Sequence, residues 1–263
     1  LESFGPILDL AGRGIAPTDY RGVDAFVEKN FDRNGRDCLF IFGNADIVPL
    51  ATYDNPTRGQ PGDLDVSVLS DDLFGDFDHD AAGDPDIIVV RMPDDPGILA
   101  DPNSTLYRAS ATAQKIALAD YAVLGNRNRS TPPLLAEIGS PGKRNLLAIS
   151  TPQTADTLSK AFFTGHNVLI NLHGSDDPRA GGVHWGEEAD GTVVTAMTAD
   201  HAVAPDGVVI TSACYGASLA SEQSDGTFVP KSSDTQIAMR FLRNGAAAYI
   251  GCTRVAWAAG VNP

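Results

Sequence analysis

The sequence predicts an α/β protein with a mostly parallel central sheet flanked by helices. Short apolar, β-branched runs bounded by turn residues recur along the chain, and residues 208–211 (VVIT) are the clearest example. Runs of this kind are typical of strands buried on both faces of a parallel sheet. They alternate with segments whose apolar residues recur at helical spacing, which is the pattern of a single α/β domain.

The N-terminal half begins with a predicted helix at 19–31, where Val23, Phe26 and Val27 recur at helical spacing. A buried strand, a loop, an irregular segment rich in Gly, Pro and Asp, and a second strand follow at 38–42, 43–49, 52–72 and 87–91.

The C-terminal half continues the alternation. Helices are predicted at 106–124, 154–163, 192–199 and 233–244, with Gly245 as the stop signal of the last one. Strands are predicted at 133–138, 146–149, 168–172, 208–211 and 246–251. We expect one domain over 1–263, with subdomains at roughly 1–130 and 131–263.

Composition excludes several classes of partner. The 263 residues carry a formal net charge of −15, which argues against nucleic acid and anionic membrane surfaces. The sequence has no apolar run long enough to span a membrane. A hydrophobic content of 43% is that of a soluble globular protein.

The three cysteines are too few and too far apart for a disulfide framework or a zinc cluster. Cys38 begins one predicted strand and Cys252 follows another, so both are expected to be small buried hydrophobic residues. Cys214 differs because it follows a buried strand, at the sheet edge where α/β proteins place their ligands.

A second buried strand, 168–172, ends at His173-Gly174. An imidazole beside a thiol can form the thiolate and later return the proton to a leaving group. The N–H groups of Gly174 and Cys214 could together form an oxyanion hole. The alternative at this point is a core cysteine and an unrelated histidine at a strand end.

The order of these two motifs resembles the caspase-like cysteine peptidases of clan CD. The segments LFIFGNADIVP and SDDLFGDFDHDAAGDPDIIVVRMP are similar to the N-terminal half of the gingipain-type family. LHGSDDPRAGGVHWG is similar to its His-Gly segment, and FLRNGAAAYIGCTRVAW to the strand after its Cys helix. The resemblance covers residues 19–257.

This resemblance implies a caspase-like fold and cysteine endopeptidase activity on a protein or peptide substrate. It implies that Cys214 is the nucleophile, His173 the base and then the acid, and that Ser212 and Trp257 bind substrate. The segment between Pro133 and the His173 strand is shorter than the family's, so the residue that orients the histidine is left open. Glu137 lies near the corresponding place.

Cleavage after Arg or Lys is the expected specificity. An arginine held in a pocket needs a carboxylate partner, and Asp176 and Asp177 follow the His-Gly motif. Trp257 could stack on the guanidinium plane.

A cysteine peptidase mechanism needs no cofactor. A structural calcium ion is nevertheless one interpretation of the acidic segment. Asp76, Asp78 and Asp80 alternate as the oxygen ligands of a calcium loop do. The Gly and the final Glu of an EF-hand are missing, so a solvated acidic turn is the competing interpretation.

Two alternatives stay open. One is a caspase-like module of the CHAT type that is activated by a partner. The strand before Cys214 and the sequence Asn244-Gly245-Ala246 are the features that suggest it. The other is a catalytically silent interaction module with the same fold. The resemblance to the gingipain-type family predicts a secreted or cell-surface location in preference to a cytoplasmic one.

Overall fold

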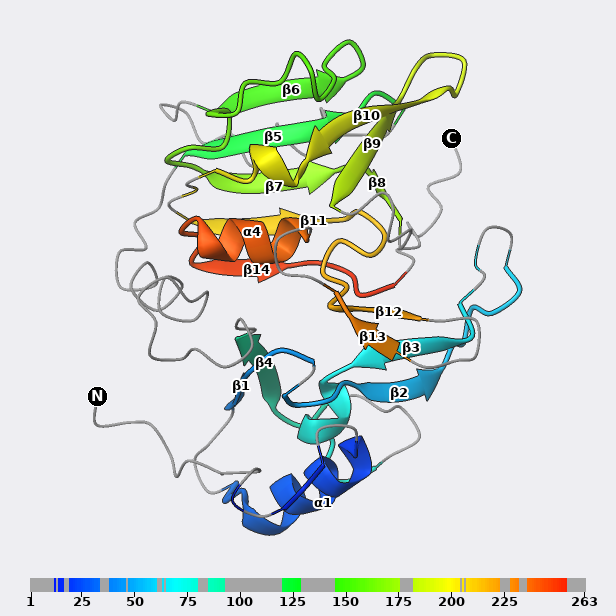
Figure 1. Ribbon diagram of the computed structural model, residues 1–263, viewed down its shortest axis with the longest axis vertical. Coiled ribbons are helices and arrows are strands. Elements are labelled where there is room, and N and C mark those ends of the chain that lie inside the picture. The colour runs from blue at the N-terminus through cyan, green and yellow to red at the C-terminus, as the bar shows by residue number, and fades with distance from the viewer. Residues whose placement is uncertain are drawn as a thin grey trace. The chain divides into compact units, whose positions relative to one another are not determined.

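The computed structural model describes most of both halves of the chain. The described residues are 12, 14–16, 19–33, 38–45, 47–60, 63, 65–79, 85–92, 120–128, 145–175, 182–203, 205, 207–222, 228–231 and 236–254. The chain divides into two compact units (Figure 1). Unit 1 comprises Leu1–Arg58 and Val66–Gly97, and unit 2 comprises Gly59–Asp65 and Ile98–Pro263.

Unit 1 is built on one helix and a pair of parallel strands. Helix α1 (Tyr20–Asn30) begins where the Asp19 carboxylate accepts a hydrogen bond from the Gly22 N–H at 2.9 Å. Strands β1 (Cys38–Phe42) and β4 (Ile88–Met92) pair in parallel. The helix and β1 each contribute two residues to one apolar cluster, and Val89 of β4 packs against it. Its members are Val23, Val27, Leu39, Ile41, Val48, Phe74 and Ile87. The helix and both strands predicted here are confirmed.

The segment expected to be irregular contains a hairpin. Strands β2 (Ala51–Asp54) and β3 (Ser67–Ser70) pair antiparallel, and the 3₁₀ helix η2 (Asp72–Gly75) follows. Each strand has four residues, and the Gly- and Pro-rich stretch between them hides their alternation in the sequence. The expectation of an irregular segment over 52–72 is therefore wrong for the residues that form β2 and β3.

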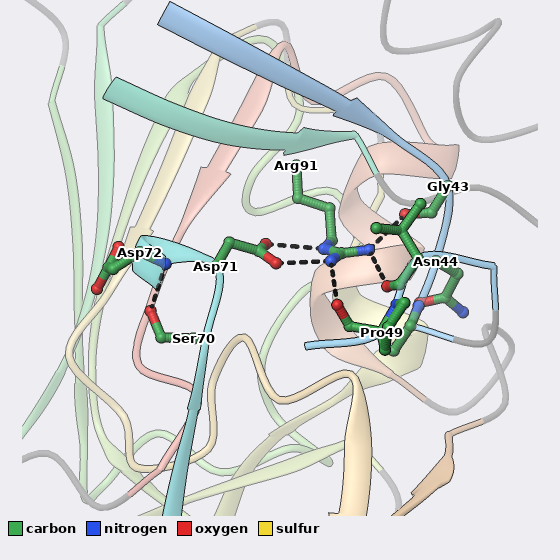
Figure 2. Close-up of polar contacts among 9 residues, drawn as sticks. Gly43, Asn44, Pro49, Ser70, Asp71, Asp72 and Arg91 are labelled. Atoms are coloured by element: carbon green, nitrogen blue, oxygen red, sulfur yellow. Dashed lines mark hydrogen bonds and ion pairs between the residues drawn. The ribbon is translucent and has the colours of Figure 1, made fainter. Parts of the chain in front are cut away.

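A buried arginine holds the loops of unit 1 together (Figure 2). The Arg91 side chain is 6% exposed and forms two parallel bonds to the Asp71 carboxylate, at 2.8 and 2.6 Å. Its remaining N–H groups donate to the carbonyl oxygens of Gly43, Val48 and Pro49, at 2.9, 2.8 and 3.4 Å. One guanidinium thus satisfies the backbone of the loop after β1 and fixes the start of η2.

Unit 2 contains the central sheet that the sequence predicts. Its strand order is β14-β11-β7-β5-β6, and every pair is parallel. The strands are β5 (Tyr121–Asn126), β6 (Leu146–Ser150), β7 (Asn167–Asn171), β11 (Val208–Thr211) and β14 (Ala248–Ile250). The middle strands carry wholly buried residues such as Val123, Ile170 and Val209. The mostly parallel α/β fold is confirmed.

Helix α4 (Ile237–Arg243) packs against β14, and five of its seven residues are buried. Asn244 is the residue that caps the helix, and Gly245 adopts a φ of +112°, which residues with a side chain rarely adopt. Asn244-Gly245-Ala246, which suggested a CHAT-type module, therefore has a structural explanation as the C-terminal cap of α4.

A second, antiparallel sheet of order β10-β9-β8 follows the end of β7 in the chain. It contains β8 (His173–Gly174), β9 (Val183–Glu187) and β10 (Val193–Thr198), and η4 (Ala199–His201) follows it. The remaining pair, β12 (Ala220–Glu222) and β13 (Phe228–Pro230), is a short antiparallel ribbon.

Three predicted helices differ from the structure. The segment 192–199 is β10, because its residues alternate against β9 instead of covering a sheet. Turns occupy 154–163, and 121–124 belong to β5. The rest of the helix at 106–124, up to residue 119, and the strand at 133–138 lie outside the described residues. Among the described helices, none has the length and apolar character needed to cross a membrane.

We expect Arg91→Ala to lower the unfolding free energy by about 3 kcal/mol, because it leaves the partly buried Asp71 carboxylate and three carbonyl groups without the guanidinium. Arg33→Ala is the matched control. Arg33 is 49% exposed, and its pair with Asp86 at 3.3 Å predicts a loss of about 1 kcal/mol or less. Urea denaturation measures both, and equal losses would contradict the role given to Arg91.

Candidate active site

The central sheet brings the predicted histidine and cysteine to one edge. Strands β7 and β11 are parallel neighbours, with Thr211 opposite Ile170. The ladder continues one step further, where the Ser212 N–H donates to the Ile170 carbonyl at 2.9 Å. His173 lies two residues beyond β7, and Cys214 three residues beyond β11. Both therefore follow the carboxyl ends of adjacent strands, as the sequence predicts.

Gly174 and Cys214 are in direct backbone contact. A Cβ added to Gly174 would overlap the carbonyl oxygen of Cys214 and would lie 3.3 Å from the Cβ of Ala213. Only glycine leaves room for the backbone to approach this closely. The segment that carries the histidine is thus packed on the turn that carries the cysteine.

Glu187 provides a carboxylate for the histidine. The His173 Nε2 lies 3.0 Å from Glu187 Oε1, and the two side chains are 32% and 23% exposed. The register of β8 against β9 places His173 opposite Trp185, so Glu187 is two residues along on the same face. This diagonal position is within reach of a long side chain.

The second oxygen of Glu187 is held by two amides from the end of β5. Asn126 and Asn128 donate to Oε2 at 3.0 and 3.1 Å. Partial burial raises the pKa of Glu187, but these two bonds and the charge of His173 outweigh it, and the pKa lies below its ordinary value. Glu187 is therefore ionised at neutral pH and fixed in orientation.

The turn after β11 is closed by hydrogen bonds between residues close in sequence. The Ala213 N–H donates to the Thr211 hydroxyl at 3.1 Å, and the Gly216 N–H to the Ala213 carbonyl at 3.1 Å. The exposed Ser212 hydroxyl donates to Asn171 at 2.8 Å, which joins the ends of β11 and β7. Ser212, predicted to bind substrate, thus lies at the sheet edge beside the cysteine.

The three cysteines are all within the described residues and form no disulfide. Burial raises the pKa of Cys38, and it also raises the pKa of Cys252, together with the charge of Cys214. Both residues are only partly buried, so the expectation of full burial is wrong. Their raised pKa values keep them as thiols at neutral pH, where thiolate chemistry is weak.

His184 is a buried imidazole on the opposite face of β9 from Trp185 and Glu187. It is 4% exposed, and burial lowers its pKa to about 4. It pairs across the strands with Gly174. At neutral pH it is uncharged and contributes packing beneath β8.

Two groups of possible metal ligands lie in unit 1. Oxygen atoms of Asp76, Asp78 and Asp86 lie within 4.8 Å of one another, and ligand atoms of Asp24, Glu28 and His79 form a similar group. Two of the three residues predicted to bind calcium, Asp76 and Asp78, are thus brought together. The third, Asp80, lies outside the described residues, and Asp86 joins the group instead.

Several predicted site residues cannot be placed, because Trp257, Glu137, Asp176 and Asp177 all lie outside the described residues. Glu187 was missed by the sequence analysis. Its signal is the alternation of VHWGE at 183–187, which predicts a strand with Val183, Trp185 and Glu187 on one face.

A comparison with solved structures finds two structures of a cysteine peptidase that resemble this chain. One is a complex of the pro- and mature domains of Porphyromonas gingivalis RgpB, with a TM-score of 0.54, 12% identity and 89% of this chain covered. The other is the Arg-specific cysteine proteinase gingipain R (RgpB), with a TM-score of 0.53, 12% identity and 90% covered. This chain spans 54% of the length of each.

Other comparisons find no match, whether with protein-family models or with curated proteins. The likeness to gingipain R at 12% identity shows a shared fold. The chain therefore has a caspase-like α/β fold.

Proposed function

We propose that this chain is a cysteine endopeptidase in which Cys214 is the nucleophile and His173 the general base and acid. The observation that carries the proposal is the backbone contact of Gly174 with Cys214 across neighbouring strand ends. It joins the two segments that the reaction needs at one sheet edge, where α/β folds bind their ligands.

The reaction follows from the groups at this edge. His173 accepts the thiol proton, and the Cys214 sulfur attacks the substrate carbonyl carbon, whose oxygen becomes an oxyanion. The oxyanion accepts hydrogen bonds from the N–H groups of Gly174 and Cys214. The C–N bond breaks as His173 gives its proton to the leaving amine. Water then attacks the thioester, His173 accepts its proton, and the thiol is restored as the acid product leaves.

Glu187 acts on His173 and not on the substrate. Its pair with Nε2 fixes the ring and leaves Nδ1 to exchange the proton with the thiol. The carboxylate also stabilises the imidazolium that forms during the reaction. The bonds from Asn126 and Asn128 hold the carboxylate in place.

We propose that the peptidase cleaves after a basic residue, Arg before Lys. The net charge of −15 favours basic substrates, and one structure of similar fold is described as an Arg-specific proteinase. Trp257, Asp176 and Asp177 are the residues proposed to contact the basic side chain.

Calcium is a proposed stabiliser of unit 1, with no part in the chemistry. Asp76, Asp78 and Asp86 supply hard oxygen ligands of the kind that calcium prefers. Backbone bonds orient two of them, because the His79 N–H donates to Asp76 and the Phe77 N–H to Asp86, each at 2.9 Å.

We expect Cys214→Ala to lower peptide cleavage by at least about 1,000-fold, and Glu187→Gln to lower kcat by about 100-fold with little change in KM. Glu188→Gln is the matched control. Its carboxylate accepts from the Thr151 hydroxyl at 2.8 Å, and its cleavage rate should stay within about twofold of wild type.

Cleavage of a quenched fluorescent peptide library by the full chain measures these variants. Near wild-type cleavage by Cys214→Ala would refute the assignment of the nucleophile. Equal effects of the Glu187 and Glu188 variants would remove Glu187 from the site. Absence of cleavage by the wild-type chain, with a folded site, would favour the catalytically silent interaction module.

Substrate preference is measured with matched peptides that differ only in the residue before the cleaved bond. We expect Arg to exceed Lys by about tenfold, and both to exceed Asn and Asp, since bidentate pairing favours the planar guanidinium. A preference for Asp or Asn would overturn the basic specificity and leave the cysteine mechanism untouched.

Calcium binding is measured by the midpoint of thermal unfolding. We expect millimolar calcium to raise Tm in the wild type but not in Asp86→Asn, because binding to the folded state stabilises it. Asp72→Asn, an exposed residue outside the group, should keep the full rise. An unchanged wild-type Tm, or an equal rise in Asp86→Asn, would refute this site.

A further inference from the structure

The residue after the proposed nucleophile is anchored by a buried acid–base cluster of three side chains. The Tyr215 hydroxyl lies 2.8 and 2.7 Å from the two oxygens of the Asp65 carboxylate. Arg254 Nη1 lies 3.8 Å from Asp65 Oδ1. The Asp65 and Arg254 side chains are 11% and 5% exposed, so water screens this cluster little. We refer to Asp65, Tyr215 and Arg254 as the anchor cluster.

The backbone of Tyr215 is left-handed, with a φ of +54°. Residues other than Gly, Asn and Asp rarely adopt this conformation, so the surroundings must hold it. Three backbone bonds contribute. The Tyr215 N–H donates to the Arg254 carbonyl at 2.9 Å, the Ala217 N–H to Cys252 at 2.9 Å, and the Ser218 N–H to the Tyr215 carbonyl at 3.1 Å.

Arg254 thus holds Tyr215 directly, through the hydrogen bond to its carbonyl, and indirectly, through its ion pair with the Asp65 carboxylate that accepts from the Tyr215 hydroxyl. Asp65 is separated from Tyr215 by 150 residues in the chain and belongs to Gly59–Asp65, the segment grouped with unit 2. A charged acceptor held by a buried cation is a strong partner for a phenol. Both ends of Tyr215 are therefore fixed independently of the turn itself.

The conformation of Tyr215 determines where Cys214 lies. The peptide plane between the two residues contains the Cys214 carbonyl, and that carbonyl packs on Gly174 with no room to spare. Rotation about φ of Tyr215 would tilt this plane and move the carbonyl relative to Gly174. The thiol and the His173 segment would then lose their alignment.

We propose that the anchor cluster is a positioning device that holds Tyr215 left-handed and so aligns the Cys214 thiol with His173. The inference rests on the proposed function for its consequence in catalysis. Its structural part concerns the placement of the thiol and can be tested without any substrate. A tyrosine is needed because phenylalanine would fill the same space without reaching Asp65.

The test compares alkylation of single cysteines by iodoacetamide in the full-length chain, followed by mass spectrometry. In Tyr215→Phe and Asp65→Asn, we expect the Cys214 rate to fall about fivefold to tenfold, because the thiol leaves its base. The Cys38 rate in the same samples is the internal control and should not change. The Cys214 alkylation rate of the double variant should be no lower than that of either single variant, because both substitutions break the same Tyr215–Asp65 hydrogen bond.

Circular dichroism shows which variants fold, and Asp65→Asn carries the test if Tyr215→Phe does not fold. Val123→Ala loses wholly buried methyl groups on β5 and separates lost stability from lost positioning. A Cys214 rate within twofold of wild type in the folded anchor variants would overturn the proposal. An equal fall of the Cys214 alkylation rate in Val123→Ala would also overturn it.

Peptide cleavage by the same variants separates this inference from the proposed function. If the wild type cleaves, kcat should fall about as far as the alkylation rate while KM stays within twofold. If no variant cleaves but Cys214 alkylation falls as expected, the proposed function fails and the positioning role stands. If cleavage and alkylation are both unchanged in the anchor variants, the positioning role fails and the peptidase assignment stands.

Discussion

The parallel pairing of β7 with β11 is the constraint on which the rest of the site depends. It brings two strand ends together and extends past the last ladder residues through the Ser212 N–H bond to Ile170. Gly174 then approaches the Cys214 backbone so closely that no side chain fits between them. The placement of the turn that carries Cys214 relative to the segment that carries His173 therefore follows from close backbone packing.

Each of the two groups is then fixed from its own side. His173 is held by Glu187, which reaches it from β9 and is itself held by two amides from the end of β5. Tyr215, next to Cys214, is held by Asp65 and Arg254. Reactive groups need partners of this kind, because a packed backbone alone does not set the rotamer of an imidazole or the tilt of a peptide plane.

The sequence predicts well those features that depend on a short stretch of the chain. The strands at 38–42 and 208–211 match the structure, because a buried parallel strand is a short apolar run whatever its neighbours. The ends of two such strands were enough to predict that His173 and Cys214 lie at the same edge of the sheet. The prediction of a helix at 192–199 is wrong, because the apolar residues of VVTAMT fit either a helical or a strand periodicity until β9 is known to lie beside them. The role of Glu187 could not be predicted because it follows from the register of β8 against β9. The role of Asp65 could not be predicted because it follows from a contact with a residue 150 positions away in the chain.

We propose that the fold sets Cys214 apart from the other two thiols as a nucleophile directed at peptides. The most direct measurement is covalent labelling of the intact chain with a peptidyl ketone probe that carries a thiol-reactive group, followed by peptide mapping. We expect a single adduct, on Cys214, that disappears when His173 is replaced by Ala. A chain left unlabelled, or labelled equally on Cys38, Cys214 and Cys252, would contradict it.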